Sequence, residues 1–412
     1  MREMKDSGIE WIGQIANTHK LVRLKYIAEI LDEYRKPVTA QYRNQNADIL
    51  YDYYGASGII DKIDGYTIDD HVMLIGEDGA NLKLHNLPLM YEVCGKAWIN
   101  NHAHILKPMK NVDFYYLFYA LESLDINNYI TGSAQPKLNQ ENLKEILIPL
   151  PSYGIQRKVA SYLDTKCSEI DATAEDIQKE ISLLEDYKKS VITEAVTKGL
   201  NPDAEMKDSG IEWVGKVPVT WKIMPNKYIM TKKKVIKEVY DDENIISLSM
   251  NGVIVRDLEA GGKMPKTFDG YQIVYPGNLL MCLFDYDVTP RCIGLIKDYG
   301  VTSPAYSQFV MNNDNYSGYY YYYYLMIDHA KTLLHLAKNL RHSFTEEQLG
   351  AILAPVPTVE EQYQIVNYLD TKCSEIDTLI ADKKRQLDTL ADYKKSLIYE
   401  YVTGKKEVPV NE

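Results

Sequence analysis

The sequence lacks the motifs of common enzymes that act on nucleotides or nucleic acids. No Gly-Lys pair is followed by Ser or Thr, so the usual phosphate-binding loop is missing. No two prolines are adjacent, which removes the Asn/Asp-Pro-Pro-aromatic loop of amino-methyltransferases. The five cysteines show no Cys-x-x-Cys spacing and the eight histidines form no His-x-x-x-His pair. We therefore expect a chain that is not an enzyme and that binds no cofactor or metal of its own.

Two acidic segments keep one alternative open. "GEDG" at residues 76–79 and "FDYD" at residues 284–287 place carboxylates close together, and oxygen ligands of this kind can hold a hard cation. A polar hairpin turn is the other interpretation of both segments, and the more frequent one.

Long apolar runs and excess positive charge are also missing. No run of 18 apolar residues occurs, and "MREMKDSGIEW" lacks the apolar stretch of a signal peptide, so we expect a cytoplasmic protein that does not enter a membrane. The formal net charge is −12, which argues against a basic nucleic-acid coat protein but not against local basic patches.

Phenylalanine is scarce, with 6 residues against 34 tyrosines. A run of six tyrosines at residues 319–324 could stack on bases. An aromatic helix or strand that packs into its own domain is the alternative, and we favour it.

Two long segments occur twice. "MKDSGIEWIG" at residues 4–13 returns as "MKDSGIEWVG" at residues 206–215, and "YLDTKCSEID" at residues 162–171 returns unchanged at residues 368–377. Matches of this length identify an internal repeat of two halves. We call the first repeated segment the opening segment of each half.

Each half also contains a long predicted helix. After a Pro-x-Pro pair, Ser152 or Thr358 begins a segment without proline that runs to Gly199 or Gly404. Apolar residues recur there at alternating steps of four and three, which is typical of a coiled-coil seam; Lys188, Lys383 and Lys394 interrupt it. A pseudo-twofold axis between the halves would make the two helices antiparallel.

The repeat predicts an α+β fold with two similar globular domains and two long antiparallel helices. We place the first globular domain at residues 1–147, the first helix at 148–200, the second globular domain at 201–353, and the second helix with a tail at 354–412. Because the linker before the second opening segment follows a helix, the N-terminal opening segment should complete the end of the second helix in the same way.

Together these segments resemble the specificity subunit of type I restriction–modification systems. The resemblance rests on the repeated "DSGIEW[IV]G", on "GSAQPKLNQENLKEILIPLP" at residues 132–151, and on "PVPTVEEQYQIVNYLD" with its first-half counterpart. The first half departs from the pattern, with Ala16 and His19 where the second has Pro218 and Trp221.

The resemblance implies a function in a larger complex. Each domain is expected to read one half of a bipartite, asymmetric double-stranded DNA target, with the helices as a ruler for the spacer. One chain would join two modification subunits, which carry S-adenosylmethionine and methylate adenine, and two restriction subunits, which use ATP and Mg²⁺.

Polar and basic residues in the predicted loops are the candidates for DNA contact, because Arg and Lys pair with guanine, and Asn and Gln with adenine. In the first domain they are Ser57, Lys62, Ser133, Gln135 and Lys137, and in the second Lys263, Lys266, Arg291, Asn339, Arg341 and Ser343. Lys233, in the basic segment "TKKKVIK", is expected to touch phosphates.

Two other functions are compatible with parts of the sequence. A coiled-coil adaptor with two protein-binding domains would explain the heptads and the acidic charge, but not why the domain loops differ between the halves. A self-contained methyltransferase or nuclease is disfavoured by the missing motifs.

Overall fold

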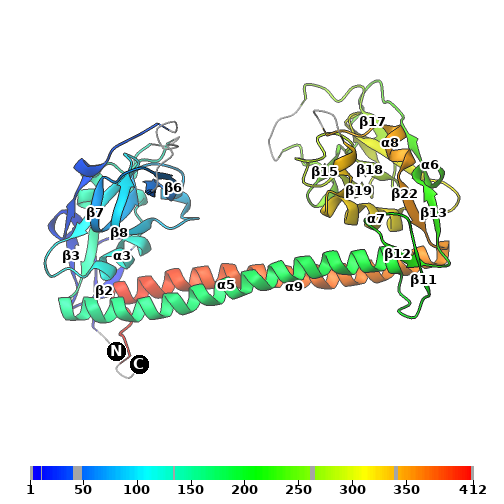
Figure 1. Ribbon diagram of the computed structural model, residues 1–412. Coiled ribbons are helices and arrows are strands. Elements are labelled where there is room, and N and C mark those ends of the chain that lie inside the picture. Colours follow the sequence, from blue (N-terminus) through cyan, green and yellow to red (C-terminus); the bar gives the residue numbers. More distant parts are fainter. Residues whose placement is uncertain are drawn as a thin grey trace. The chain divides into compact units, whose positions relative to one another are not determined.

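The computed structural model describes residues 3–10, 12–39, 49–132, 135–259, 265–337 and 342–409. The chain divides into two compact units, and each contains one globular part and a section of both long helices (Figure 1). Unit 1 comprises residues 1–177 and 385–412, and unit 2 comprises residues 178–384. The long helices are α5 (Tyr153–Lys198) and α9 (Val359–Val402).

Unit 1 is built on a six-stranded sheet in the order β4-β9-β7-β8-β5-β6, and two strand pairs, β1-β2 and β3-β10, stand beside it. Its strands are β1 (Met4–Asp6), β2 (Gln14–Ala16), β3 (Lys20–Arg23), β4 (Ala28–Ile30), β5 (Tyr51–Gly55), β6 (Gly58–Ile63), β7 (Ile68–Gly76), β8 (Met90–Ile99), β9 (Ala103–Pro108) and β10 (Leu147–Leu150). Its shorter helices are α2 (Asn81–Leu84), α3 (Phe114–Ser123) and α4 (Gln140–Glu145).

Unit 2 has a four-stranded sheet in the order β14-β21-β18-β19 and four strand pairs. Its strands are β11 (Met206–Asp208), β12 (Lys216–Pro218), β13 (Lys222–Pro225), β14 (Met230–Lys233), β15 (Ile246–Ser249), β16 (Gly252–Val255), β17 (Gln272–Val274), β18 (Leu279–Met281), β19 (Ile293–Leu295), β20 (Gly300–Thr302), β21 (Ser307–Met311) and β22 (Leu353–Val356). Its shorter helices are α6 (Asn226–Ile229), α7 (Ser317–His329) and α8 (Glu346–Ala351). The expected α+β class is confirmed.

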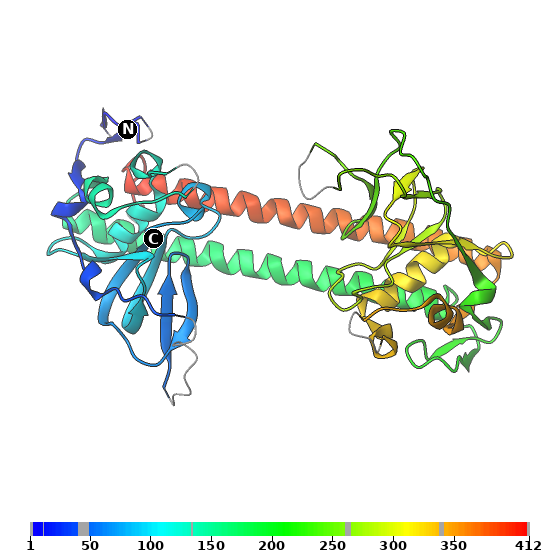
Figure 2. The ribbon, with the colours of Figure 1, turned by 90° about the horizontal axis from the view of Figure 1, so that it is seen from above.

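The two long helices run antiparallel within each unit, as the repeat predicts, and lie alongside each other in perpendicular views (Figures 1 and 2). In unit 2, Glu180 of α5 pairs with Lys383 of α9, while Lys188, further along α5, pairs with the earlier Asp377 at 2.6 Å. In unit 1, Asp171 pairs with Lys394 at 2.6 Å. The lysines that interrupt the heptad pattern therefore each reach an acidic residue on the other helix.

Burial along the helices follows the heptad pattern. Leu163, Cys167 and Ile181 of α5 and Leu369 and Cys373 of α9 are buried. Exposed ion pairs contribute at most about 1 kcal/mol each, so this apolar seam supplies most of the stability of the helix pair and the lysines fix its register.

A buried glutamine fastens the start of each helix to its globular part. In unit 1 the side chain of Gln156 accepts from the Asp113 amide at 2.9 Å and donates to the Pro151 carbonyl at 2.9 Å. In unit 2 Gln362 makes the same two bonds, to Tyr316 at 2.7 Å and Pro357 at 3.1 Å. The two halves thus share their scaffold contacts as well as their sequence.

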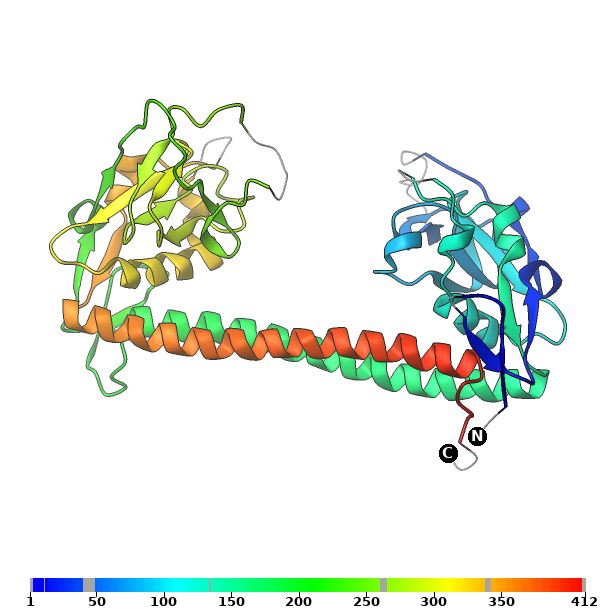
Figure 3. The same cartoon turned by 180° about the vertical axis from the view of Figure 1, so that it is seen from behind.

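The residues that follow the opening segments pack where the long helices end. Gly404 closes α9 with φ +72°, and a Cβ there would lie 2.6 Å from the ring of His19. Gly199 closes α5 with φ +74°, and a Cβ there would lie 3.2 Å from Trp221. The Ala16 amide also donates to the Thr403 carbonyl at 3.0 Å. The residues after the N-terminal opening segment therefore complete the end of α9, and the segment that follows α9 lies in the same unit as the first strands (Figure 3).

The tyrosine run lies in α7 and serves the core of unit 2. Tyr319, Tyr320 and Tyr323 are fully buried, and Tyr322 and Tyr324 nearly so. The packing interpretation is confirmed for these five tyrosines, whereas Tyr321 is half-buried. Among the described residues, none of the helices combines the length and hydrophobicity needed to cross a membrane.

Gln156→Ala should destabilise unit 1 by about 2–4 kcal/mol, because it leaves a buried amide and a buried carbonyl without a partner. Urea denaturation measures the loss. Gln178→Ala, on an exposed position of the same helix, is the matched control and should change stability by less than about 0.5 kcal/mol. Equal effects of the two substitutions would contradict the fastening role.

Candidate nucleic-acid interface

Four loops of unit 1 come together where β7 ends and β9 begins. A Cβ on Gly76 would lie 2.7 Å from the carbonyl oxygen of Ala56, so only glycine lets the β5–β6 turn approach β7 this closely. The Glu77 amide donates to the His102 carbonyl at 2.8 Å, and the Gly79 amide donates to the Pro136 carbonyl at 3.1 Å. We call this the unit 1 loop cluster; it comprises residues 56–57, 77–79, 100–102 and 135–137.

The strands must curl to bring these loops together. β8 pairs with β7 from Ala97 opposite Ile68 to Met90 opposite Ile75, whereas β9 begins with Ala103 opposite Gly76. The end of β8 lies beside the start of β7, and the start of β9 lies beside the end of β7. Only three residues join β8 to β9, so the sheet must curl until the two ends of β7 approach the same edge. Sequence alternation alone does not show this closure.

A network of charged side chains stabilises the unit 1 loop cluster. Arg35 pairs with both Glu77 and Asp32, the latter at 3.1 Å, and Lys137 pairs with Glu77 at 3.0 Å. The buried His104 ring bonds to Asp32 at 2.7 Å and to the Leu138 carbonyl at 2.8 Å. These bonds tie the segment that carries Lys137 to β7 and β9.

The pKa values of the two carboxylates reflect these contacts. Burial acts to raise the pKa of Glu77, but hydrogen bonds from Arg35 and Lys137 outweigh burial and hold that pKa below its ordinary value. Burial also opposes ionisation of Asp32, where contacts with His104 and the Ile105 amide lower the pKa. Both carboxylates are therefore ionised at neutral pH and form part of the scaffold.

The first-domain candidates divide into two groups. Ser57, Gln135 and Lys137 all lie in the unit 1 loop cluster, where Ser57 and Gln135 are exposed. Lys137 is partly engaged by Glu77. Lys62 lies elsewhere and pairs with Asp52 at 2.8 Å. It is four residues along β6 from the β5–β6 turn, which places it roughly 13 Å from that turn at 3.3 Å per residue.

Sequence reasoning did not select the β8–β9 turn. Asn101 and His102 are exposed there, and His102 bonds to Asp78 at 2.7 Å. The run of polar residues between two apolar segments, "NNHAH", is the signal that could have identified them. Ser133 lies outside the described residues.

In unit 2, Arg291 organises the corresponding loops. Its guanidinium donates to the Met250 carbonyl at 2.9 Å and to the Ile293 carbonyl at 3.1 Å, and it contacts the Tyr321 hydroxyl. The β15–β16 turn, with exposed Met250 and Asn251, is thereby held against β19. Most donors of Arg291 are used inside the protein, so its main role is to position this turn.

The unit 2 loop cluster comprises residues 250–251, 285–287, 291 and 342–343. His342 pairs with Asp287 at 2.9 Å, and the Tyr286 amide donates to the His342 carbonyl at 3.3 Å. The structure thus brings the candidates Arg291 and Ser343 together and adds Asn251. Lys266 is exposed on a separate segment, and Lys263, Asn339 and Arg341 lie outside the described residues.

The basic segment "TKKKVIK" is partly neutralised. Lys232 pairs with Glu346 and Lys237 with Glu243. The Lys233 ammonium lies 3.6 Å from the centre of the Tyr275 ring, and Lys234 is exposed. Phosphate contact by this segment remains a prediction that falls mainly on Lys233 and Lys234.

The acidic segments are engaged in ion pairs. Glu77 contacts Arg35 and Lys137, Asp78 contacts His102, and Asp287 contacts His342. Within the part of the chain that the structure describes, no group of three or more His, Cys, Asp or Glu side chains could hold a metal ion.

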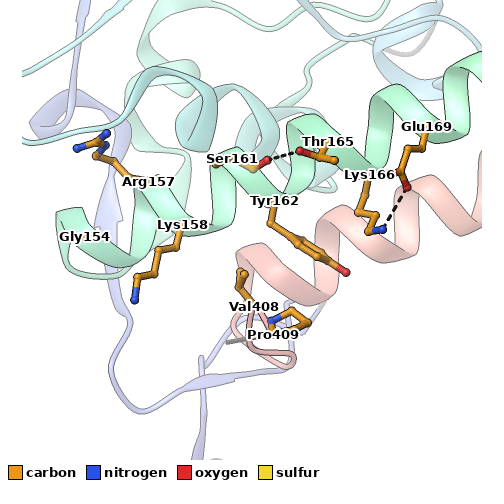
Figure 4. Close-up of a pocket in the computed structure, with 10 residues that line it drawn as sticks. All are labelled: Gly154, Arg157, Lys158, Ser161, Tyr162, Thr165, Lys166, Glu169, Val408 and Pro409. Atoms are coloured by element: carbon orange, nitrogen blue, oxygen red, sulfur yellow. Dashed lines mark hydrogen bonds and ion pairs between the residues drawn. The ribbon is translucent and has the colours of Figure 1, made fainter. Parts of the chain in front are cut away.

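Each unit also carries one groove beside its helix ends. In unit 1 a groove of about 830 Å³ is lined by Arg157, Lys158 and Tyr162 of α5 and by Val408 and Pro409 after α9 (Figure 4). Figure 4 shows Tyr162 extending toward Val408 and Pro409.

In unit 2 a groove of about 840 Å³ is lined by Tyr368 of α9, Lys198 of α5, and Leu200 and Pro202 after α5. Tyr162 and Tyr368 occupy the same place in the repeated "YLDTKCSEID", so the two grooves share this position of the repeat, although most of their other lining residues differ.

Comparison with known proteins finds relatives of one kind. The sequence model described as "Type I restriction modification DNA specificity domain" matches residues 17–183. A putative type I restriction enzyme specificity subunit of Haemophilus influenzae, S.HindORF215P, is 32% identical over 141 residues, 34% of this chain and 35% of that protein. The putative MjaX specificity subunit of Methanocaldococcus jannaschii is 24% identical over 405 residues, 94% of this chain and 84% of that protein.

A solved structure shows the same fold. It is described as concerning complex assembly and conformational transition of the type I R-M system, and its chain matches with a TM-score of 0.68 at 12% identity. The match covers 95% of this chain and 99% of that chain.

The stabilisation from Glu77 should depend on pH. Because the folded-state pKa of Glu77 is lowered, its contribution is complete above the unfolded value of about 4.5 and is lost as pH falls through the folded value. Glu77→Gln should therefore cost about 1–3 kcal/mol at pH 7 and progressively less toward pH 3, measured by urea denaturation. Exposed Glu141→Gln is the control. A cost that stays constant with pH would contradict the network.

Proposed function

This chain belongs to the type I restriction–modification DNA specificity family, and we propose that it reads a two-part, asymmetric DNA sequence for partner subunits that methylate and cleave DNA. Each loop cluster would read one half of the target, and α5 and α9 would set the spacer between the halves. The chain itself would act in the cytoplasm as the non-catalytic subunit.

The observation that carries this proposal is one scaffold with two sets of loops. The Leu138 amide donates to the Glu77 carbonyl at 2.8 Å, and the Phe344 amide donates to the Leu283 carbonyl at 2.8 Å. The backbone bond is therefore the same in both units, while the side chain beside it is a carboxylate in one and an alkyl group in the other. A scaffold conserved by duplication, with loops of different chemistry, suits a reader of two different half-sites.

The exposed side chains in the loop clusters have the chemistry of base readout. Ser57, Gln135 and His102 in unit 1, and Asn251 in unit 2, can donate to or accept from base edges. Lys233 and Lys234 can contact phosphates, which orients a protein on DNA without reading sequence. The chain's acidic charge would leave part of the phosphate contact to partner subunits.

The adaptor alternative is weaker than DNA recognition. It accounts for the helix pair but gives no reason why Glu77 and Leu283 differ on an otherwise shared backbone. The match to the DNA specificity family also favours DNA recognition.

Catalysis would belong to the partners. The methyl donor S-adenosylmethionine would bind the modification subunits, and ATP and Mg²⁺ the restriction subunits. The proposed complex holds two modification subunits, and the presence of one groove with a repeated tyrosine beside the helix ends of each unit supports this number. The two restriction subunits would complete the assembly.

Charge reversal in one groove should remove one modification subunit. We expect Arg157→Glu, in the unit 1 groove, and Lys198→Glu, in the unit 2 groove, each to reduce the bound modification subunits from two to one, and the double variant to lose both. Native mass spectrometry of the co-expressed complex counts them. Lys297→Glu, exposed outside both grooves, should keep two; unchanged stoichiometry in all variants would exclude the grooves as docking sites.

Mapping of methylated adenines across the genome tests the proposed function directly. Deletion of this gene should abolish methylation at one motif made of two short, different halves and a fixed gap. Asn251→Ala should relax or weaken recognition in one half only, since a lost base contact costs about 1–3 kcal/mol. If no motif changes while the partner genes are expressed, the chain does not specify sequence and the adaptor function replaces the proposal.

A further inference from the structure

Unit 2 contains a pocket that the proposed function does not use. It has a volume of about 390 Å³ and lies between α7, α5 and α9. Its charged lining consists of four cations and two carboxylates: Lys188, Lys189, Arg291, Lys384, Glu185 and Asp377. Tyr321 and His329 of α7 also line it.

The cations are only partly paired. Lys188 contacts Asp377 at 2.6 Å and Lys189 contacts Asp186 at 2.9 Å. Lys384 makes no ion pair with any described residue and is exposed. The His329 pKa lies below its ordinary value because of partial burial and the nearby cations Arg291, Lys189 and Lys188. The pocket is therefore a region of positive potential.

The corresponding place in unit 1 contains a carboxyl group of the protein itself. Glu122 of α3 accepts from the Leu89 amide at 2.9 Å and from the Met90 amide at 2.8 Å. Burial raises the Glu122 pKa to about 7, and Lys394 and Lys395 oppose that shift. These lysines are the repeat equivalents of Lys188 and Lys189, since both pairs belong to the segment "DYKKS".

The equivalent residue in unit 2 is Leu325. Tyr119 donates to Asp164 at 2.8 Å in unit 1, and Tyr322 donates to Asp370 at 2.6 Å in unit 2, so the two tyrosines correspond. Glu122 and Leu325 each follow their tyrosine by three residues. Unit 2 has the same lysine pair, with Arg291, Lys384 and His329 at the site and Leu325 in place of Glu122. The α7 carboxylate that accepts a hydrogen bond from a backbone amide in unit 2 is Asp328, one turn further along, which is bonded to the Cys292 amide at 2.7 Å.

We propose that this pocket binds a phosphate group, beside the position where Leu325 replaces the Glu122 of unit 1. A tetrahedral oxyanion can accept from Lys384, from the ammonium of Lys188 or Lys189, and from the free donors of Arg291 at the same time. The space is large enough for a phosphate, and the surplus of cations over carboxylates matches its charge. The phosphate comes either from the DNA backbone or from free inorganic phosphate.

Inorganic phosphate alone tests the site. At constant ionic strength, replacing chloride by phosphate should raise the thermal unfolding midpoint of the full chain by several degrees and saturate, because a ligand that binds only the folded state stabilises it. Leu325→Glu restores the carboxylate found in unit 1 and should abolish this response. The same substitution at exposed Leu183 of α5, outside the pocket, is the matched control and should leave the response intact.

A second variant tests the same site independently, in case Leu325→Glu does not fold. Lys384→Gln changes only an exposed side chain and should weaken the response to phosphate several-fold. An identical response in wild type, Leu325→Glu and Lys384→Gln, or no response of wild type beyond that of chloride, would overturn the proposal. The phosphate experiment contains no DNA, so its outcome does not depend on the proposed function.

The salt dependence of DNA binding distinguishes the two sources of the phosphate. With the assembled complex and a duplex that carries the mapped target, a backbone phosphate predicts that Leu325→Glu lowers the slope of log affinity against log salt by about one unit. A free phosphate predicts an unchanged slope together with the stability response.

Discussion

The antiparallel apolar seam between α5 and α9 is the constraint on which the other features depend. Both units draw on it, because each takes a section of both helices into its core. Leu163, Cys167, Leu369 and Cys373 bury the seam, and the lysines that interrupt it form ion pairs across it. Lys188 with Asp377 and Asp171 with Lys394 are one interaction used twice, with the roles of the helices exchanged. The duplication thus produces a helix pair whose register satisfies both halves.

The globular parts are attached to this seam by contacts that are also duplicated. Gln156 and Gln362 bond equivalent backbone groups at the helix starts, and Gly199 and Gly404 admit Trp221 and His19 at the helix ends. With the scaffold fixed in this way, the loops can change without loss of the fold. Glu77 and Leu283 illustrate the result, since an identical backbone bond carries a charged network in one unit and an apolar side chain in the other.

The same freedom explains why several charged candidates turned out to have scaffold roles. Arg291 donates hydrogen bonds to the Met250 and Ile293 carbonyls and contacts the Tyr321 hydroxyl, and Lys137 pairs with Glu77. In a chain with a net charge of −12, an isolated basic side chain finds a nearby carboxylate more readily than in a basic DNA-binding protein. The exchange of Glu122 for Leu325 is the reverse case, because it places an apolar side chain beside the cations that line the pocket of unit 2.

The sequence by itself determined the repeat, the helix pair and its direction, and the resemblance to type I specificity subunits. These follow from periodicity and from long exact matches, which are local properties of the chain. Only the tertiary structure decided which loops meet. The curl of β7, β8 and β9 brings Ser57, His102 and Gln135 to one rim, whereas Lys62, close to Ser57 in sequence, lies at the far end of its hairpin. Loop proximity depends on strand register and sheet curvature, and neither leaves a signal in the spacing of residues.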